Sequence, residues 1–299
     1  MVENAKILII GLGEIGYSNA EYMTKLGLPV QGYDINRMAV RRAVRNGVIN
    51  RGASNFSGFD YYVVCVSTHS IEDMAEPSFG GLFSVAERLS IEGTEGALIS
   101  IESTVAKGIS NKVKEIVGHR LHVAHFPHRY YVKDRDEHGV RQMRVLGGCE
   151  ECCLTAAISF YRDLLEIPFH LVTSVEVAEL TKIIENSYRF LEIAFSEELF
   201  LFCNAYGIDY NELRGSINSK WNMNLLEAMG GIGGHCLPKD TEMYRKILSR
   251  VSQLSIIESA KEADERYKLE LAYKPKLKKL TTLKRPRIER TEAVQELIA

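Results

Sequence analysis

A cysteine in a glycine-rich loop is the residue of this 299-residue sequence best suited to covalent chemistry. Residues 230–240 read Gly-Gly-Ile-Gly-Gly-His-Cys-Leu-Pro-Lys-Asp, so Cys236 follows four glycines and precedes Lys239 and Asp240. The glycines let the backbone approach a ligand. A thiol attacks as its thiolate, and nearby positive charge or a helix N-terminus lowers the thiol pKa. We therefore predict a nucleophilic Cys236, against the plainer interpretation of a small buried residue in a tight loop.

A second polar set lies where one long helix is predicted. Residues 174–206 contain no proline or glycine, and apolar residues recur there at helical spacing. Glu179, Lys182 and Asn186 are three and four positions apart, so they share one face of this helix. A row of polar residues is usually a solvated face. Asparagine is a poor helix former, however, and Asn186 favours a face that lines a polar cleft.

The sequence Gly11-Leu12-Gly13-Glu14-Ile15-Gly16 has the G-x-G-x-x-G pattern of a dinucleotide-binding turn. It follows a predicted strand and opens a predicted helix, and Asp34 ends the next strand 18 positions after Gly16. An acidic residue there accepts hydrogen bonds from the ribose hydroxyls and favours NAD over NADP, although Arg37 could neutralise the repulsion of a 2′-phosphate. The alternative is a glycine-rich turn without a ligand. The residues predicted to bind NAD here are Gly11, Gly13, Glu14, Ile15, Gly16, Asp34 and Arg37.

The elements around these residues alternate. Strands are predicted over 6–10, 29–34, 61–67, 97–101 and 121–126, with helical stretches between them, including 14–26 and 37–46. This alternation predicts an α/β fold: a Rossmann-like, doubly wound parallel sheet. An all-helical domain built on the long helix follows, with helical pattern over 210–217 and 254–271. The predicted domains are 1–172 (NAD-binding), 173–272 (helical) and 273–299 (a basic C-terminal tail).

Composition narrows the class of protein. The 37 basic and 39 acidic residues nearly balance, which argues against binding nucleic acid, and no run of 18 residues lacks a charge, so no membrane span is expected. The N-terminus has no signal-peptide pattern, so we expect a cytoplasmic protein with reduced cysteines. We interpret the basic segment 274–290 as flexible or weakly docked.

Two patterns that suggest a metal are interpreted as structural, and no metal is expected. Histidines recur at every third position (His119, His122, His125 and His128), but on a strand that spacing alternates between faces. Three cysteines resemble half of a zinc site (Cys149, Cys152 and Cys153), but no second Cys/His pair follows at a suitable spacing.

Five segments, in order, resemble the UDP-glucose/GDP-mannose (nucleotide-sugar) dehydrogenase family. They are the dinucleotide loop with residues 30–36, Cys65-Val66-Ser67-Thr68, Glu102-Ser103-Thr104-Val105, residues 178–182 through Asn186, and Gly233–Cys236 with Pro238, Lys239 and Asp240. The resemblance covers nearly the whole chain. It implies oxidation of a sugar C6 alcohol to a carboxylate in two NAD-dependent steps.

The resemblance also implies roles for individual residues. Cys236 matches the nucleophile that holds a thiohemiacetal and then a thioester, and Lys182 matches the lysine that transfers a proton or stabilises charge at the C6 oxygen. Asn186 would donate a hydrogen bond to that oxygen. Asp240 matches a carboxylate that assists water or the lysine, and Thr104 a hydroxyl that positions water. Further cofactor contacts are expected at Val66, Ser67, Thr68 and Thr104, and substrate contacts at Lys182, Asn186, Lys220, Asn222 and Gly233.

The chain departs from the family pattern in two ways. The family has a proline–glutamate pair whose glutamate helps to activate water, and this chain has Pro127-His128, so His128 is expected to serve as the base near neutral pH. The family's third, nucleotide-binding domain has no counterpart after Leu271, so we expect a naturally short or a truncated chain. A homodimer through helix 174–206 is expected. The Gly-Gly-His-Cys loop favours an acetamido-sugar such as UDP-N-acetylmannosamine.

Two other functions remain open. The chain could be a non-catalytic or regulatory NAD-binding homologue that lost the sugar-nucleotide domain. A smaller hydroxy-acid dehydrogenase is disfavoured, because such an enzyme needs no nucleophilic cysteine.

Overall fold

The computed structural model describes residues 5–70, 72, 76–131, 134–135, 137–252 and 255–278. The chain divides into two compact units, Met1–Phe190 with Gly234–Ile257, and Leu191–Gly233 with Glu258–Ala299. The predicted boundary at 172 stays a prediction. Residues 279–299, most of the predicted basic tail, lie outside the described residues.

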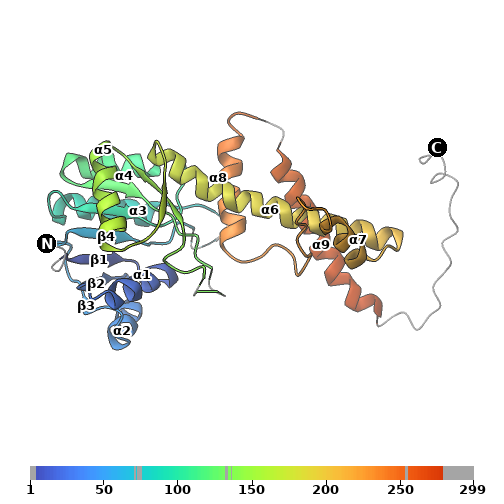
Figure 1. The fold of residues 1–299 in the computed structure, drawn as a ribbon, viewed down its shortest axis with the longest axis horizontal. Coiled ribbons are helices and arrows are strands. Elements are labelled where there is room, and N and C mark those ends of the chain that lie inside the picture. Colours follow the sequence, from blue (N-terminus) through green and yellow to red (C-terminus); the bar gives the residue numbers. More distant parts are fainter. Residues whose placement is uncertain are drawn as a thin grey trace. The chain divides into compact units, whose positions relative to one another are not determined.

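The first unit contains an eight-stranded sheet with the order β3-β2-β1-β4-β5-β6-β7-β8. The neighbouring strands β3, β2, β1 and β4 are labelled in Figure 1. Neighbouring strands are parallel except β6 and β7, which pair antiparallel. The predicted doubly wound sheet is therefore confirmed, and an edge of two strands in the opposite direction extends it. The strands are β1 (Ile7–Ile10), β2 (Val30–Tyr33), β3 (Arg51–Gly52), β4 (Tyr61–Val64), β5 (Leu98–Ile101), β6 (His122–His125), β7 (Arg144–Gly148) and β8 (Phe169–Leu171).

Helices cover both faces of this sheet, so its central strands β1, β4 and β5 are largely buried and, apart from Ser100, apolar. In β1, Ile7 and Ile9 belong to one buried cluster with α1 and α5, whereas Leu8 and Ile10 belong to another with α3 and α4. The helices of this unit are α1 (Glu14–Lys25), α2 (Arg37–Arg45), α3 (Gly80–Glu92), α4 (Ile109–Val117), α5 (Glu151–Ile158), the first half of α6 (Val175–Tyr206) and α8 (Cys236–Leu248). A 3-10 turn (Gly118–Arg120) and a π-helical turn (Ser159–Leu164) extend α4 and α5.

The second unit is helical, as the sequence predicts for this part of the chain. It contains the rest of α6, α7 (Tyr210–Asn218) and most of α9 (Ile256–Lys278). The Phe200 ring centroid lies 5.4 Å from that of Tyr210 and 5.4 Å from that of Tyr267, which makes a small aromatic core. The loop after α7 is held to α9, because Ile232 donates its backbone N–H to Asp264 at 2.7 Å.

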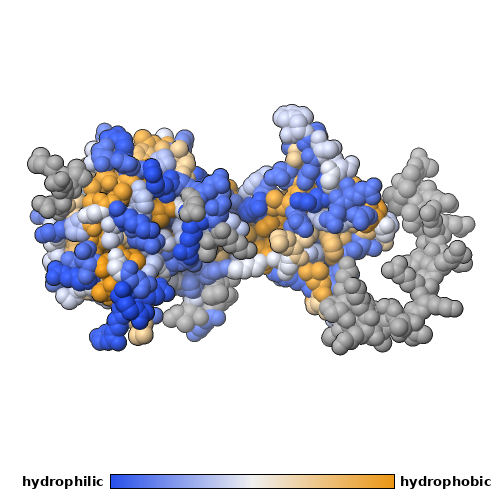
Figure 2. Space-filling view, turned by 60° about the horizontal axis from the view of Figure 1, so that its bottom comes forward, coloured by the Kyte–Doolittle hydropathy of each residue, from blue (hydrophilic) through white to orange (hydrophobic). Residues whose placement is uncertain are grey.

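Apolar residues are also exposed on both units among hydrophilic ones (Figure 2). Large apolar side chains of α6 are prominent among them, and they are Val177, Ile184, Tyr188, Phe195, Phe202 and Tyr206. Among the described residues, no helix combines the length and the apolar character that a bilayer span requires.

Candidate active site

The three glycines of the nucleotide loop differ in why the structure has a glycine at each position. Gly11 has a positive φ of 93°, and a Cβ there would lie 2.5 Å from the Cys65 carbonyl oxygen. A Cβ on Gly16 would lie 1.8 Å from the Gly11 carbonyl oxygen, so only glycine lets α1 pack against β1. A Cβ on Gly13 would meet no atom within 4 Å, so this position opens onto free space. Open space beside a helix N-terminus is what a pyrophosphate needs.

Asp34 stands where the second strand ends and fixes the loop. Its carboxylate accepts the backbone N–H of Leu12 at 2.7 Å and that of Asn36 at 2.7 Å. A carboxylate accepts about four hydrogen bonds, so capacity remains for ribose hydroxyls. Arg37 is exposed at the start of α2. These residues therefore fit an adenosine ribose.

The other predicted cofactor residues follow the carboxyl ends of β4 and β5. Val66 is half-buried, and its carbonyl accepts the Ser103 hydroxyl at 2.6 Å. Thr68 is buried, and its hydroxyl oxygen accepts a hydrogen bond of 3.4 Å from the Lys239 ammonium. Ser67 is exposed and Thr104 is half-buried. Because β1, β4 and β5 are parallel neighbours, these loops emerge at the same edge of the sheet as the nucleotide loop.

Three candidate catalytic side chains, from α6 and α8, are linked to one another by polar contacts, and we call them the Lys182–Asn186–Asp240 chain. The Lys182 ammonium lies 3.5 Å from Asn186 Oδ1, and Asn186 Nδ2 donates to Asp240 at 2.5 Å. Asp240 also makes an ion pair with Lys239 at 2.7 Å, and both of these residues are buried. Cys236 is the first residue of α8 and is exposed. The structure thus brings together Lys182, Asn186 and Asp240, with Cys236 one helical turn from Asp240.

The electrostatics of Cys236 differ from the sequence expectation of a lowered pKa. Partial burial and the Asp240 carboxylate raise the pKa of the thiol, and they outweigh Lys182 and Lys239, which lower it. The lysines have less effect than expected because Asp240 pairs with Lys239. Glu14 is close enough to contribute to the same shift, so the thiol lies within electrostatic range of the nucleotide loop.

Burial lowers the pKa of Lys182, although the Asp240 carboxylate works against this shift. A lowered pKa makes the lysine a better proton acceptor near neutral pH. Lys182 therefore has the setting of a group that exchanges protons with a substrate.

Glu179, the third polar residue predicted for this face, has a different role. It is buried, and its two carboxylate oxygens accept the backbone N–H groups of Gly108 at 2.6 Å and Ser110 at 2.7 Å. It therefore caps the N-terminus of α4 and does not line a cleft.

His128 lies in a buried network around Glu102. Its Nε2 bonds the Glu102 carboxylate, which also accepts hydrogen bonds from Asn19 at 2.7 Å, Arg144 at 2.7 Å and Tyr161 at 2.6 Å. Burial opposes ionisation of Glu102, but Arg144 and His128 hold the pKa of its carboxyl well below the usual range. Burial and Arg144 lower the pKa of His128 to about 4. The imidazole is therefore neutral at pH 7 and a weaker base than the sequence suggests.

The sequence pattern missed most of this network. Glu102 stood out through the family resemblance, but Asn19, Arg144 and Tyr161 come from three separate elements with no shared spacing. A histidine pair was also missed: His235 Nε2 lies 2.5 Å from His69 Nδ1, next to Cys236. Burial, together with His69, lowers the pKa of His235.

The remaining predicted substrate residues belong to the second unit. Lys220, Asn222 and Gly233 are exposed there. Their place in a substrate site stays a prediction.

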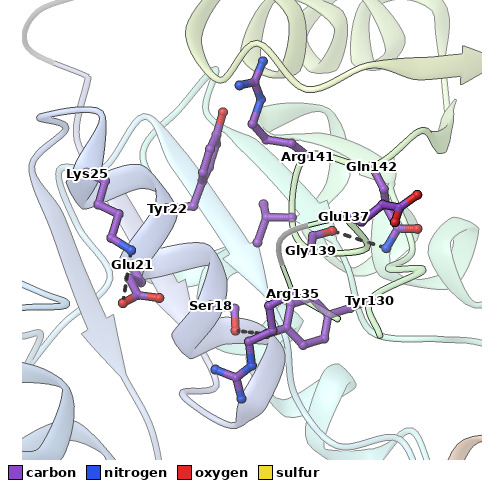
Figure 3. Close-up of a pocket in the computed structure, with 11 residues that line it drawn as sticks. Ser18, Glu21, Tyr22, Lys25, Tyr130, Arg135, Glu137, Gly139, Arg141 and Gln142 are labelled. Atoms are coloured by element: carbon purple, nitrogen blue, oxygen red, sulfur yellow. Dashed lines mark hydrogen bonds and ion pairs between the residues drawn. The ribbon is translucent and has the colours of Figure 1, made fainter. Parts of the chain in front are cut away.

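A pocket of about 400 Å³ lies elsewhere on the first unit, between α1 and Tyr130, Arg135, Glu137 and residues 139–142 (Figure 3). Ser18 and Tyr130 meet at its wall, with a hydrogen bond of 3.1 Å between their hydroxyl groups. None of the predicted catalytic residues lines it. It is therefore distinct from the Lys182–Asn186–Asp240 chain.

Comparisons with known proteins agree with this architecture. Residues 176–266 match the model of the UDP-glucose/GDP-mannose dehydrogenase family, central domain. A UDP-N-acetyl-D-mannosamine dehydrogenase of Methanococcus maripaludis is 26% identical over 87% of this chain and 65% of its own length. The Escherichia coli K12 protein of that name is 28% identical over 87% of this chain and 69% of its own.

Among solved structures, a UDP-D-ManNAc dehydrogenase from Pyrococcus horikoshii superposes with a TM-score of 0.75 at 25% identity, over 89% of this chain and 70% of that one. The chain thus spans about two thirds of the length of these relatives. The central-domain match and the fold agree, so the chain resembles the UDP-glucose/GDP-mannose dehydrogenase family, with residues 176–266 matching the central domain of that family.

Proposed function

We propose that this chain carries the catalytic residues of an NAD-dependent nucleotide-sugar 6-dehydrogenase, which oxidises a sugar C6 alcohol to a carboxylate. The observation that supports this proposal most directly is the polar chain Lys182–Asn186–Asp240 beside Cys236, with Glu14 of the nucleotide loop in electrostatic range of the thiol. A hydroxy-acid dehydrogenase would have no use for this cysteine.

The nucleotide loop fits NAD. Gly13 leaves free space at the N-terminus of α1, and Asp34 retains hydrogen-bonding capacity for the ribose. NAD supplies the hydride acceptor of both oxidation steps. The protein's task is to hold the sugar C6 beside it and to manage the protons.

Lys182 is proposed as the group that takes the proton of the C6 hydroxyl as the alcohol becomes an aldehyde. Its pKa is lowered by burial, which favours the neutral, proton-accepting form. Asn186 Oδ1 orients the lysine, and Asn186 Nδ2 keeps one N–H for the C6 oxygen because Asp240 uses only one of the two.

Cys236 is proposed to add to the aldehyde carbon and form a thiohemiacetal. Because its pKa is raised, the thiol is protonated at neutral pH in the free chain and must lose its proton as the C–S bond forms. Asp240 is the acceptor at hand, and Lys182, which holds the proton taken from the C6 hydroxyl, returns a proton to the aldehyde oxygen as its C=O bond becomes a C–O bond. A second oxidation then leaves a thioester on Cys236.

Hydrolysis of the thioester releases the carboxylate and restores the thiol. Thr104 and His128 are proposed to position and deprotonate the attacking water. The Glu102 bond to Nε2 leaves His128 Nδ1 as the free nitrogen, and this buried atom has no hydrogen-bond partner among the described residues. With a pKa of about 4, His128 is a weak base, so this step is expected to be slow.

The substrate is proposed to be a UDP-linked acetamido-sugar. The support is the Gly-Gly-His-Cys sequence of the loop and the name that the relatives share. Lys220, Asn222 and Gly233 are proposed to contact the sugar nucleotide.

A panel of UDP- and GDP-sugars, each incubated with NAD and the chain, tests this proposal through NADH formation. UDP-N-acetylmannosamine is expected to give the highest rate, and Cys236→Ala is expected to abolish formation of the carboxylate. NADH formation from no sugar in the panel would contradict the proposal.

The second candidate is a non-catalytic NAD-binding homologue, and the raised Cys236 pKa and lowered His128 pKa favour it. Thiol labelling separates the two. Cys65 is the reference, because burial holds its pKa well above the usual value. A Cys236 that reacts no faster than Cys65 would favour the non-catalytic protein.

A further inference from the structure

A histidine and two cysteines that are far apart in the sequence meet at one end of the sheet. His122 is the first residue of β6, and Cys152 and Cys153 lie in the first turn of α5. The metal-ligating atoms of all three lie within 4.8 Å of one another. Sequence spacing did not indicate this meeting, because the histidine precedes the cysteines by 30 positions across β7.

The imidazole is poised to bind a ligand. His122 Nδ1 is buried and has no hydrogen-bond partner among the described residues. A buried polar atom without a partner is costly, and bonding to a metal would remove this cost. Cys152 is exposed and Cys153 is buried, so a metal could enter from solvent on the Cys152 side.

The residue before α5, Glu150, is a candidate for the fourth ligand, because it lies near both sulfurs although it is not among the three residues whose ligand atoms meet within 4.8 Å. One carboxylate oxygen of Glu150 lies 3.6 Å from Cys152 Sγ and 3.9 Å from Cys153 Sγ. The same oxygen lies 3.0 Å from the Lys114 ammonium, and the other oxygen lies 3.8 Å from His119 Nδ1. Glu150 therefore reaches both sulfurs, although a metal would share it with Lys114.

The spacing suits zinc. Zinc binds thiolate sulfur at about 2.3 Å and imidazole nitrogen at about 2.1 Å, so two tetrahedral ligand atoms lie roughly 3.5 to 3.8 Å apart. Atoms within 4.8 Å need to close by about 1 Å. Two sulfurs, one nitrogen and one carboxylate oxygen also suit zinc better than magnesium or calcium.

We propose that His122, Cys152 and Cys153, with Glu150 as the fourth ligand, form a structural zinc site that fastens β6 to α5. The site is separate from the candidate active site. His122 begins β6, whereas His128 follows the carboxyl end of the same strand, so the two lie beyond opposite ends of it.

Cobalt(II) is the probe that tests this site, because Co²⁺ with thiolate ligands has strong absorption bands whereas Zn²⁺ has none in the visible range. The chain is stripped with a chelator under reducing conditions, which also prevents a disulfide between the two cysteines, and is then titrated with Co²⁺ followed by Zn²⁺. We expect one equivalent of Co²⁺ with thiolate charge-transfer and tetrahedral d–d bands, and loss of these bands when Zn²⁺ displaces it.

Variants locate the site. Cys152→Ser, at an exposed position, and His122→Gln are each expected to lose the bands while circular dichroism stays unchanged. Cys149→Ser is the matched control for a nearby cysteine, and Cys236→Ser tests binding near the His69–His235 pair. Both are expected to keep the bands. No thiolate bands in the unchanged chain, bands that survive Cys152→Ser, or bands that disappear in Cys236→Ser would each overturn the proposal.

Discussion

At the scale of single residues, burial changes the chemistry that residue type alone suggests. The glycine-rich loop, the cysteine and the following charges are legible in the sequence. The direction in which the Cys236 pKa shifts cannot be read from the sequence, because it depends on the burial of the thiol and on the pairing of Lys239 with Asp240. The same holds for His128, whose low pKa comes from burial and from Arg144, a residue 16 positions away.

The lowered pKa of His128 makes the stability of the fold depend on pH. The unfolded imidazole, with a pKa near 6.5, takes up its proton before the folded one, with a pKa of about 4. Stability is therefore complete above about pH 6.5 and is lost as the pH falls toward 4, by roughly 3 kcal/mol at most. We expect urea unfolding of His128→Gln to show a smaller loss between pH 7 and 4.5 than that of the unchanged chain. The pKa of His125 is lowered to about 3, so His125 contributes to the loss of stability with falling pH in both proteins. Equal losses in the two proteins would contradict the assignment.

At the scale of elements, local patterns identified the parallel core of the sheet. The strands β1, β4 and β5 are mainly apolar, β2 and β6 mix polar and apolar residues, and the first two helices end near Gly27 and Gly47. The strands β3, β7 and β8 were not predicted. β7 ends in two glycines and is placed by its antiparallel pairing with β6, and β8 is a three-residue edge strand. Pairing of that kind is a tertiary property that a local pattern does not contain.

The nucleotide loop offers a matched pair of glycine variants. Gly16→Ala places a methyl group 1.8 Å from the Gly11 carbonyl oxygen, so we expect it to lower the melting temperature. Gly13→Ala meets no atom of the protein, so we expect an unchanged melting temperature and NAD binding weaker by about tenfold or more, because the methyl group occupies the space for the pyrophosphate. Thermal unfolding and NAD titration measure the two effects. If Gly13→Ala bound NAD as tightly as the unchanged chain, this loop would not be the nucleotide site.

At the scale of the whole molecule, the resemblance to the family followed from the order of five short segments. The arrangement of the second unit around Phe200, Tyr210 and Tyr267 did not, since aromatic packing depends on helix geometry that the sequence does not state. The exposed apolar residues of α6 are the remaining feature at this scale. They support the proposal that two copies of the chain pair through this helix.

Dimerisation through α6 can be tested by placing a charged residue among its exposed apolar side chains. Phe195 is 57% exposed on α6, and Phe195→Glu is expected to convert a dimer to a monomer, since a charge would be buried in the interface. Ile91→Glu, at a position 81% exposed on α3, is the control and is expected to leave the dimer intact. Analytical ultracentrifugation of the three proteins gives the answer. A monomer for the unchanged chain, or a dimer that survives Phe195→Glu, would exclude this interface.

The central claim is that the Cys236 sulfur holds the sugar C6 between two oxidations, and the number of NADH molecules formed per sugar tests it most directly. With limiting UDP-N-acetylmannosamine and excess NAD, the unchanged chain is predicted to form two NADH per sugar, and Cys236→Ala no more than one. Two NADH per sugar from Cys236→Ala would contradict the account.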